Sequence, residues 1–201
     1  SSAPLRYLFE RGITKADILK WKIGYCPDGE YGGRVIVPSF NLEGKINYFI
    51  GRSYKDDWMK YKNPPLQKNQ IIFNELYIDW DSDLVLTEGV FDAIVAGNAI
   101  PLLGSTLPET SRLFQEVAKH DTPIYIALDP DAEKKAKYLI KDMLQYGIEL
   151  YKIDVRDYDI LKTFLDYLNI MPETIYGIRG KNIYSSEIPL NSDIAEVLLK
   201  I

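Results

Sequence analysis

The chain has 201 residues, which allows one large domain or two small ones with a core deep enough to need no covalent staple. Hydrophobic residues make up 46% of it and no apolar run approaches the roughly 20 residues of a membrane span, so the composition predicts a globular protein and excludes a transmembrane one. With Cys26 as the one cysteine and His120 as the one histidine, neither an internal disulfide nor a Cys/His zinc site can form within this chain.

The beginning of the chain and its net charge narrow the class further. Residues 1–4 have no basic flank leading into an apolar core, which predicts a cytoplasmic protein without a signal peptide, and the missing Met indicates an excised piece. A net charge of −5 argues against a protein that coats nucleic acid through bulk positive charge. The average conceals a split, because residues 1–78 hold 12 Lys and Arg against 8 Asp and Glu while the remainder holds 12 against 21. Charge asymmetry alone is more typical of solvated faces than of a site.

The basic part, residues 1–78, is predicted to mix helices and strands. Residues 5–21 read as two short helices broken at Gly12, the second begun by Thr14 as its N-cap with Asp17 three residues on. Residues 34–40 and 45–50 predict a β-hairpin in which Gly44 takes a positive φ. Lysines and aromatic residues alternate without a period over residues 53–70, which predicts a loop that is either plain solvated surface or part of a single-stranded nucleic-acid groove.

In the acidic part, residues 79–201, the sequence pattern is different from that of residues 1–78. Strand-like runs at residues 84–86, 100–103, 124–128 and 148–153 alternate with helical stretches at 90–96, 109–120 and 131–146, the last closed by Gly147. This alternation predicts βαβ units, hence a parallel sheet with helices on its faces. From residue 159 onwards we expect a helix at 160–167 and a short one near 192–199. The predicted fold class is α/β, with an α+β part at 1–78, a parallel-sheet part at 79–160 and a helical tail at 161–201.

Acidic residues follow three of the four predicted strands of this sheet. They are Glu88, then Asp129 and Asp131, then Asp154 with Asp157 and Asp159 beyond it. The ligand of an open parallel sheet lies outside the carboxyl ends of its strands, so neighbouring strands would gather these carboxylates in a small volume where their repulsion requires a cation. Ligation by oxygen alone favours Mg²⁺ or Mn²⁺. Each acid taken singly is more often a helix N-cap than a metal ligand.

The order of short motifs resembles a known family. Residues 87–93, TEGVFDA, followed about forty residues later by ALDPD at 127–131, resemble the glutamate and DxD motifs of the Toprim domain. Upstream, the blocks at 7–13, 23–27, 33–38, 50–52 and 60–64 follow the order of those in the catalytic core of bacterial and phage DnaG-type primases, and NELY at 74–77 resembles the block that precedes the Toprim domain in that family. The similarity spans roughly residues 5–159.

The resemblance implies roles for individual residues. It makes Glu88, Asp129 and Asp131 the catalytic and metal-binding acids, and it adds Asp157 and Asp159 as further metal ligands. In an alternative mechanism, Glu88 is instead a general base. Residues that match the family's template-binding and nucleotide-binding positions, or that stand in the same blocks, are Arg11, Arg34, Arg52, Lys60, Lys62 and Asn63. The basic part would then supply a wall for DNA and triphosphate, and the acidic Toprim part would present the metals.

The same resemblance implies a reaction and partners. The reaction is template-directed synthesis of short RNA primers on single-stranded DNA from ribonucleoside triphosphates, by two-metal nucleotidyl transfer with Mg²⁺ or Mn²⁺. A replicative helicase is the expected partner, and the family's zinc-binding domain is expected to be excised or supplied by another chain. The divergent motifs favour a phage source, with the host cytoplasm as the place of action. Two alternatives stay open: a Toprim-type nuclease or phosphodiester hydrolase, and a non-catalytic module that binds single-stranded DNA or a helicase.

Overall fold

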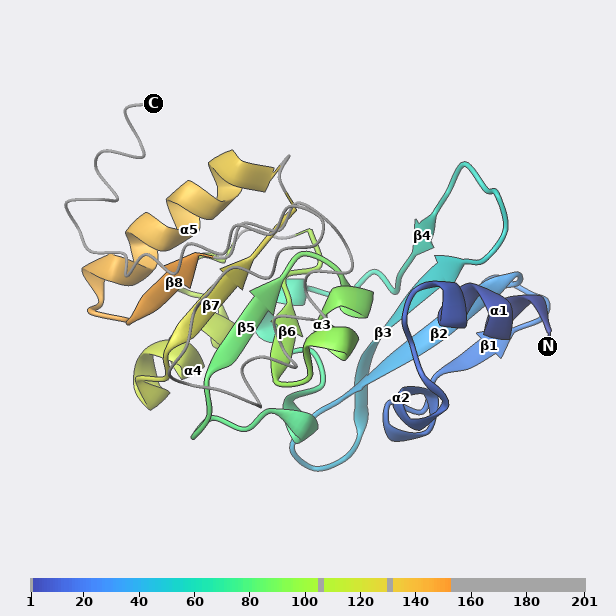
Figure 1. Cartoon of the computed structure of the whole chain (residues 1–201), viewed down its shortest axis with the longest axis horizontal. Helices are drawn as coiled ribbons and strands as arrows, with labels where there is room; N and C mark the ends of the chain where they lie inside the picture. Colours follow the sequence, from blue (N-terminus) through green and yellow to red (C-terminus); the bar gives the residue numbers. More distant parts are fainter. Residues whose placement is uncertain (1, 105–106, 130–131, 153–201) are drawn as a thin grey trace, which may run out of the picture. The chain divides into compact units, whose positions relative to one another are not determined.

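The computed structural model describes residues 2–104, 107–129 and 132–152 (Figure 1). Its contacts divide the chain into two compact units, the first ending at Tyr77 and the second beginning at Ile78. Within the described ranges, none of the helices is both long and apolar enough to cross a membrane.

The first unit is a four-stranded antiparallel sheet preceded by two helices. The helices are α1 (Ala3–Glu10) and α2 (Lys15–Lys20), and the strands, in their spatial order, are β1 (Gly24–Cys26), β2 (Arg34–Phe40), β3 (Ile46–Ser53) and β4 (Tyr61–Lys62). Two 3₁₀ turns follow, η1 (Lys68–Gln70) and η2 (Glu75–Tyr77). The α+β character predicted for this part is confirmed.

Local sequence signals fix the helix pair and the hairpin of the first unit. Thr14 and Asp17 form a capping box, in which the Asp17 N–H donates to Thr14 Oγ1 (3.2 Å) and the Thr14 N–H donates to Asp17 Oδ2 (2.8 Å). The chain leaves α1 through Gly12, whose φ of +76° is open to glycine without strain. Gly44 has a φ of +71° in the turn that joins β2 to β3. Both predicted helices and the predicted hairpin are confirmed.

The prediction of an irregular loop over residues 53–70 is partly wrong, because β4 lies within it. β4 is only two residues long and pairs with β3 through Gly51 with Lys62 and Arg52 with Tyr61. The three-residue strand β1 was also absent from the prediction. Elements this short show no periodicity of their own, and their pairing depends on a partner strand distant in sequence.

A buried asparagine ties the end of the first unit to its sheet. Asn74 is fully buried with a φ of +54°; its Oδ1 accepts from the Phe40 N–H (2.9 Å), and its own N–H donates to Ser39 Oγ (2.9 Å). The short side chain of Asn tolerates this left-handed backbone better than most residues. The NELY block at 74–77 therefore has a structural function, because it closes the last turn of the unit against β2.

The second unit is a parallel sheet with three helices. Its strands, in spatial order, are β6 (Ala99–Pro101), β5 (Leu84–Thr87), β7 (Ile124–Ala127) and β8 (Leu150–Lys152), and its helices are α3 (Val90–Ala96), α4 (Arg112–His120) and α5 (Glu133–Gln145). All three strand pairings are parallel. This confirms the predicted α/β alternation.

Two helix boundaries show how local chemistry sets an element. α4 begins three residues later than predicted, since Ser111 is its N-cap and accepts from the Phe114 N–H at 3.3 Å. α5 closes near Gly147, whose φ is +74°, as predicted. The predicted helices at residues 160–167 and 192–199 lie outside the described residues.

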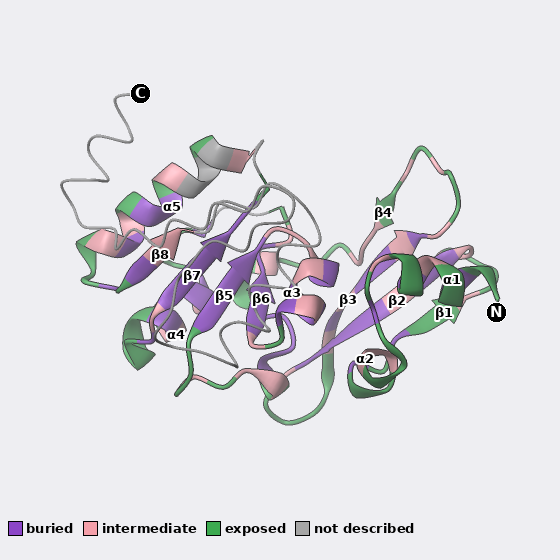
Figure 2. Cartoon of the chain, viewed as in Figure 1, coloured by how far each residue is buried: buried purple, intermediate pink, exposed green. Residues whose placement is uncertain are grey.

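Both faces of the parallel sheet are buried (Figure 2). On one face, Val85 and Tyr125 pack with Ala93 and Ala96 of α3. The strand residues that alternate with these are buried as well, among them Leu86, which is fully buried. Continuous apolar strands are the expected consequence of covering a parallel sheet on both sides, and they leave the ends of the strands as the place where polar groups reach a ligand.

Candidate functional site

Two of the predicted acids leave neighbouring strands at the same edge of the parallel sheet. β5 and β7 are hydrogen-bonded to one another, with Thr87 opposite Ala127. Glu88 follows β5 directly, and Asp129 comes two residues after β7. β8 lies on the other side of β7, so the three acid-bearing strands are adjacent, as a shared site requires. The remaining predicted acids, Asp131, Asp157 and Asp159, and also Asp154, lie outside the described residues.

Glu88 has a buried carboxylate oxygen without a donor. The side chain is half-buried, and its Oε2 is inaccessible to solvent and has no hydrogen-bond partner among the described residues. A buried carboxylate oxygen is costly unless it is hydrogen-bonded, protonated or bound to a cation. The residue therefore fits a metal ligand better than a helix cap, and α3 has no side-chain cap hydrogen bond at its start.

Gly89 lies in the turn that follows Glu88 and leads into α3. It is the N-cap of α3, and the Thr87 hydroxyl donates to its carbonyl oxygen at 3.0 Å. A Cβ at this position would lie 2.7 Å from Oδ2 of Asp92, in the first turn of α3. The TEGVFDA motif thus encodes a strand-to-helix turn in which Asp92 occupies the space beside the glycine.

Asp129 stands at the start of the turn between β7 and α5. Its carbonyl oxygen accepts from the Ala132 N–H at 2.9 Å, and the residue is exposed. Across residues 2–104, 107–129 and 132–152, no three residues among His, Cys, Asp and Glu are grouped so that they could hold a metal ion. A metal centre here depends on the acids that lie outside these ranges, and it stays a prediction.

A cavity of about 780 Å³ borders Glu88. Its wall is formed mainly by Leu102, Leu107, Pro108 and Leu139, and its polar members besides Glu88 are Lys134, Tyr138 and Asp142 of α5. This volume lies within the range of small-ligand sites, about 300–1,000 Å³. The acid edge of the second unit therefore adjoins a space that a small molecule can enter.

In the first unit, two of the predicted cations meet around two tyrosines. The Arg11 guanidinium carbon lies 4.8 Å from the centre of the Tyr7 ring, and Arg52 Nε donates to the Tyr7 hydroxyl at 2.8 Å. The Arg52 guanidinium carbon also lies 4.5 Å from the centre of the Tyr61 ring. We call Tyr7, Arg11, Arg52 and Tyr61 the Tyr–Arg cluster. The sequence predicted its two arginines as nucleotide-binding or DNA-binding residues but did not identify its two tyrosines, although both tyrosines stand in the family-like blocks.

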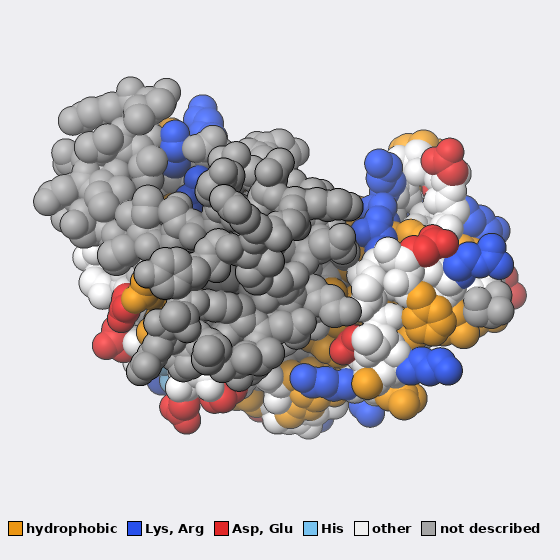
Figure 3. All heavy atoms as spheres, in the orientation of Figure 1, with side chains coloured by type: hydrophobic (Ala, Val, Ile, Leu, Met, Phe, Trp, Pro, Cys, Tyr) orange, Lys and Arg blue, Asp and Glu red, His pale blue; other side chains and the backbone are white. Residues whose placement is uncertain are grey.

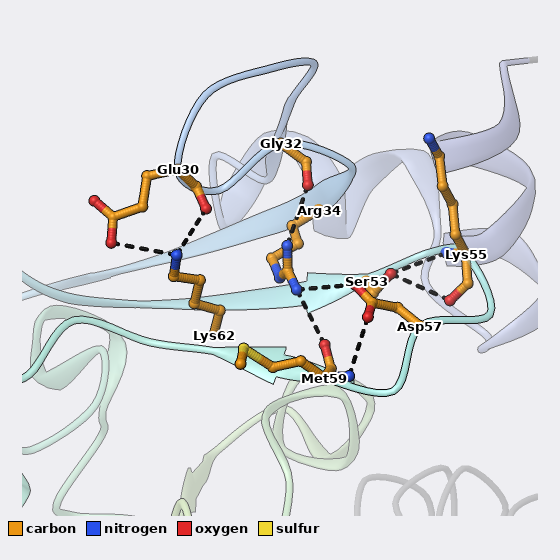
Figure 4. A network of polar contacts seen from close by, with 8 residues as sticks. All are labelled: Glu30, Gly32, Arg34, Ser53, Lys55, Asp57, Met59 and Lys62. Carbon is orange, nitrogen blue, oxygen red and sulfur yellow. Dashed lines mark hydrogen bonds and ion pairs between the residues drawn. The ribbon is translucent and has the colours of Figure 1, made fainter.

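Arg34 is placed differently from the other predicted cations. It is 7% exposed, its Nη1 donates to the Gly32 carbonyl (3.1 Å), and its Nη2 donates to Asp57 Oδ2 and to the Met59 carbonyl (3.0 Å each; Figure 4). These bonds commit both terminal nitrogens to neighbouring loops. The structure therefore gives Arg34 a structural task that the sequence did not indicate, and its predicted contact with nucleotide or DNA stays untested.

The last three predicted binding residues come from β4 and its flanks. Lys62 Nζ donates to the Glu30 carbonyl (3.0 Å), forms an ion pair with Glu30 Oε1 (3.3 Å) and lies 5.3 Å from the centre of the Tyr31 ring. Asn63 Oδ1 accepts from the Gly51 N–H at 3.2 Å, and Lys60 is exposed. Figure 3 shows several Lys and Arg side chains on the visible surface of the first unit, interspersed with hydrophobic and acidic ones.

Comparison with curated proteins shows a resemblance to bacterial DNA primases. The chain is 22% identical to the DNA primase of Staphylococcus epidermidis, over 75% of this chain and 33% of the relative. It is 28% identical to the DNA primase of Halalkalibacterium halodurans, over 69% of this chain and 31% of the relative. The chain thus spans about a third of the length of these relatives. No family model matches it.

Comparison with solved structures shows the same fold. The Aquifex aeolicus primase, in a structure of its zinc-binding and RNA polymerase domains, matches with a TM-score of 0.70 and 22% identity over 84% of this chain and 55% of that one. A DnaG primase catalytic domain bound to single-stranded DNA matches with a TM-score of 0.63 and 19% identity over 81% of this chain and 68% of that one. The chain has the fold of the DnaG primase catalytic core and resembles DNA primases in sequence, as its motifs predicted.

Proposed function

We propose that this chain is the RNA polymerase core of a DnaG-type DNA primase, which copies single-stranded DNA into short RNA primers from ribonucleoside triphosphates. The observation that carries the proposal is the pair of strand-end acids, Glu88 and Asp129, on hydrogen-bonded parallel strands of a DnaG-like fold. The buried oxygen of Glu88, which has no hydrogen-bond donor among the described residues, supports the proposal because such an oxygen is suited to a cation.

We further propose how the parts of the chain share this work. Residues 1–78 would hold template and nucleotide, residues 79–160 would form the Toprim subdomain that binds metal, and residues 161–201 would be a helical tail. The Tyr–Arg cluster supports the first assignment, because guanidinium groups bind phosphate oxygens in a bidentate manner and tyrosine rings stack with bases. The neighbouring acid-bearing strands support the second.

The acids would act as one charged centre. Glu88, Asp129 and Asp131 are the proposed catalytic residues, with Asp157 and Asp159 as additional metal ligands. Bound Mg²⁺ or Mn²⁺ would supply charge stabilisation for the attacking hydroxyl and the leaving pyrophosphate. The protein's own contribution is position, since Glu88 and Asp129 follow the ends of buried strands.

The proposed partners are single-stranded DNA, ribonucleoside triphosphates and a replicative helicase, with a zinc-binding domain elsewhere in the protein or on another chain. The DNA-bound DnaG structure with the same fold supports the template, and the Aquifex aeolicus structure that contains a zinc-binding domain supports the last of these. The cytoplasm of the host cell is the proposed place of action.

The deciding experiment is incorporation of labelled ribonucleotides on single-stranded DNA with Mg²⁺ or Mn²⁺. The chain is compared with its Asp129→Asn variant and with Asp83→Asn, which removes the same charge from an exposed residue at the opposite, amino end of β5. Short RNA products from the parent chain and from Asp83→Asn, but not from Asp129→Asn, are expected. Metal-dependent cutting of DNA without RNA synthesis would instead support a Toprim-type nuclease. DNA binding without either reaction would support a non-catalytic module.

A further inference from the structure

An exposed tryptophan occupies the loop between β3 and β4. Trp58 is 89% exposed, whereas Trp21 is 2% exposed and Trp80 is half-buried and stacked on His120. A tryptophan side chain presents one of the largest apolar areas of any residue, and exposed aromatic side chains of this size are concentrated at binding surfaces. Trp58 therefore contributes little to the packing of the first unit, and its ring is accessible to a ligand.

The loop that carries Trp58 is held on both sides of it. The buried Arg34 donates from Nη2 to Oδ2 of Asp57, the residue before Trp58, and to the carbonyl oxygen of Met59, the residue after it (3.0 Å each). Asp57 Oδ1 in turn accepts from the Met59 N–H at 3.0 Å. Figure 4 shows these bonds converging from β2 and the loop. Both neighbours of the tryptophan are thereby fixed to the sheet.

A second set of bonds holds the base of the loop. Ser53 Oγ accepts from the Lys55 N–H (3.2 Å) and donates to the Lys55 carbonyl (3.1 Å), and the Ser53 N–H donates to the Lys60 carbonyl (2.9 Å). The backbone around Trp58 is thus ordered before any ligand arrives. A ligand that binds to an ordered loop loses less affinity to conformational entropy than one that must order the loop itself.

The charges around Trp58 favour a nucleic acid over a protein. Lys55 and Lys60 are exposed on the same loop, and the charge of Asp57 is compensated by Arg34, which leaves Asp56 as the remaining acid between Ser53 and Tyr61. Proteins hold single strands by combining aromatic side chains that stack on bases with basic side chains that pair with phosphates, and this loop contains both kinds of residue. Lysine is instead depleted at interfaces between proteins, relative to the rest of the protein surface.

We propose that Trp58 is a stacking platform for a base of single-stranded DNA, with Lys55 and Lys60 beside the adjacent phosphates. The inference rests on the proposed function, because it adds one contact to the template that a primase core copies. It concerns binding alone, and its test therefore does not need RNA synthesis.

The test is a titration of the 201-residue chain with a fluorescently labelled oligodeoxythymidine, followed by polarisation, together with the tryptophan emission in the presence of unlabelled oligonucleotide. Trp58→Ala is expected to weaken binding about five-fold or more, the range seen for loss of one base–aromatic contact. Trp58→Phe retains part of the affinity because it keeps a ring, and Trp58→Leu behaves like the alanine variant. The matched control is Leu42→Ala, which removes an exposed apolar side chain (58% exposed) from the turn at the opposite end of the β2–β3 hairpin and should leave affinity unchanged.

A second variant tests the fixed loop. Arg34→Lys keeps the charge but loses the planar fork that joins Asp57 to Met59, so it is expected to weaken oligonucleotide binding with Trp58 still present. A thermal unfolding curve for each variant establishes that the binding differences belong to folded protein. If the Arg34→Lys variant does not fold, it is replaced by Asp57→Ser, which removes the ion pair and retains a short polar side chain.

The outcomes separate this inference from the proposed function. Equal affinities of Trp58→Ala and the parent chain, with tryptophan emission unaffected by DNA, would overturn it and would make a protein partner the better explanation of the exposed ring. An equal loss in Leu42→Ala would also overturn it, because the effect would then belong to any exposed apolar side chain. Quenching by DNA and weaker binding in Trp58→Ala, in a chain that makes no RNA, would uphold the stacking platform and contradict the primase proposal.

Discussion

The two units hold their charged groups in opposite ways. In the first unit the predicted cations are engaged by neighbours: Arg52 contacts two tyrosines, and Arg34 bridges two loops. In the second unit Glu88 keeps a buried oxygen with no donor among the described residues. A cation that rests on a ring or a carbonyl can still present other nitrogens to a phosphate, whereas a carboxylate that is to bind a metal must keep its oxygens free of competing donors. The comparison teaches that removing the charge of Glu88 should leave the protein equally or more stable, whereas removing the charge of Arg34 should destabilise it.

The largest expected effect concerns the acids. Glu88→Gln and Asp129→Asn should each lower RNA synthesis about a hundred-fold or more, the size of losing one major electrostatic contribution to a transition state. Stability to urea should stay equal or rise, because each change removes a negative charge from the acid edge of the sheet. Incorporation of labelled ribonucleotide and urea unfolding are measured on the same preparations. A clear loss of stability in both variants would show that these acids have structural partners, and it would contradict the difference proposed between the two units.

The next largest effect concerns the packing of β4 against β3 in the first unit. A Cβ at Gly51 would lie 2.5 Å from the Lys62 carbonyl oxygen and 3.4 Å from Cδ of Arg34. Gly51→Ala should therefore displace β4 and lower the free energy of unfolding by about 1–3 kcal/mol, as forced packing does. Gly24→Ala is the matched control, because nothing lies within 4 Å of a Cβ at that position in β1. Equal unfolding midpoints for the two variants would mean that β4 is not held where the structure places it.

A smaller effect is expected from two predicted DNA-binding cations, the half-buried Arg52 and the exposed Lys60. Arg52→Ala and Lys60→Ala should weaken binding of single-stranded DNA or nucleotide several-fold, and each should reduce the slope of log K against log salt by about one, as loss of a phosphate contact does. Lys45→Ala, an exposed lysine next to the β2–β3 turn, serves as the control. Affinities that are unchanged and insensitive to salt would remove the Tyr–Arg cluster and its neighbour Lys60 from the binding site.

The smallest effect concerns Glu116, an acid of the second unit whose carboxylate is hydrogen-bonded and which therefore serves as a comparison for Glu88. On α4, Glu116 Oε2 accepts from Lys119 Nζ at 3.0 Å, and this hydrogen bond holds the pKa of Glu116 below its usual value, against the opposing effect of burial. Because the pKa is lower in the folded state, the stabilisation is present above the unfolded pKa and is lost as pH falls through the folded one. Glu116→Gln should remove a few tenths of a kcal/mol of unfolding free energy at pH 7 and less at pH 3. An undiminished difference at pH 3 would show that the effect is not electrostatic.

Much of the fold was already determined by short-range signals in the sequence. The capping box of Thr14 and Asp17, the positive φ of Gly44 and the helix-ending Gly147 act within a few residues, so their patterns predicted α2, the hairpin and the end of α5. The alternation of strand and helix after residue 79 likewise predicted a parallel sheet, since parallel strands need a crossover between them. The candidate acids followed from the same reasoning, because ligands gather at the carboxyl ends of parallel strands.

Tertiary structure decided the rest, because pairings between distant residues leave no local pattern. Only the fold put β5 beside β7, so that Glu88 and Asp129 leave adjacent strands. Only the fold buried Arg34, by placing the acceptors of the β3–β4 loop within reach of its guanidinium. A two-residue strand such as β4 exists because β3 supplies its hydrogen bonds, and without that pairing Tyr61 would not meet Arg52. The residue types set which chemistry is possible, and the long-range packing set which of those residues share a site.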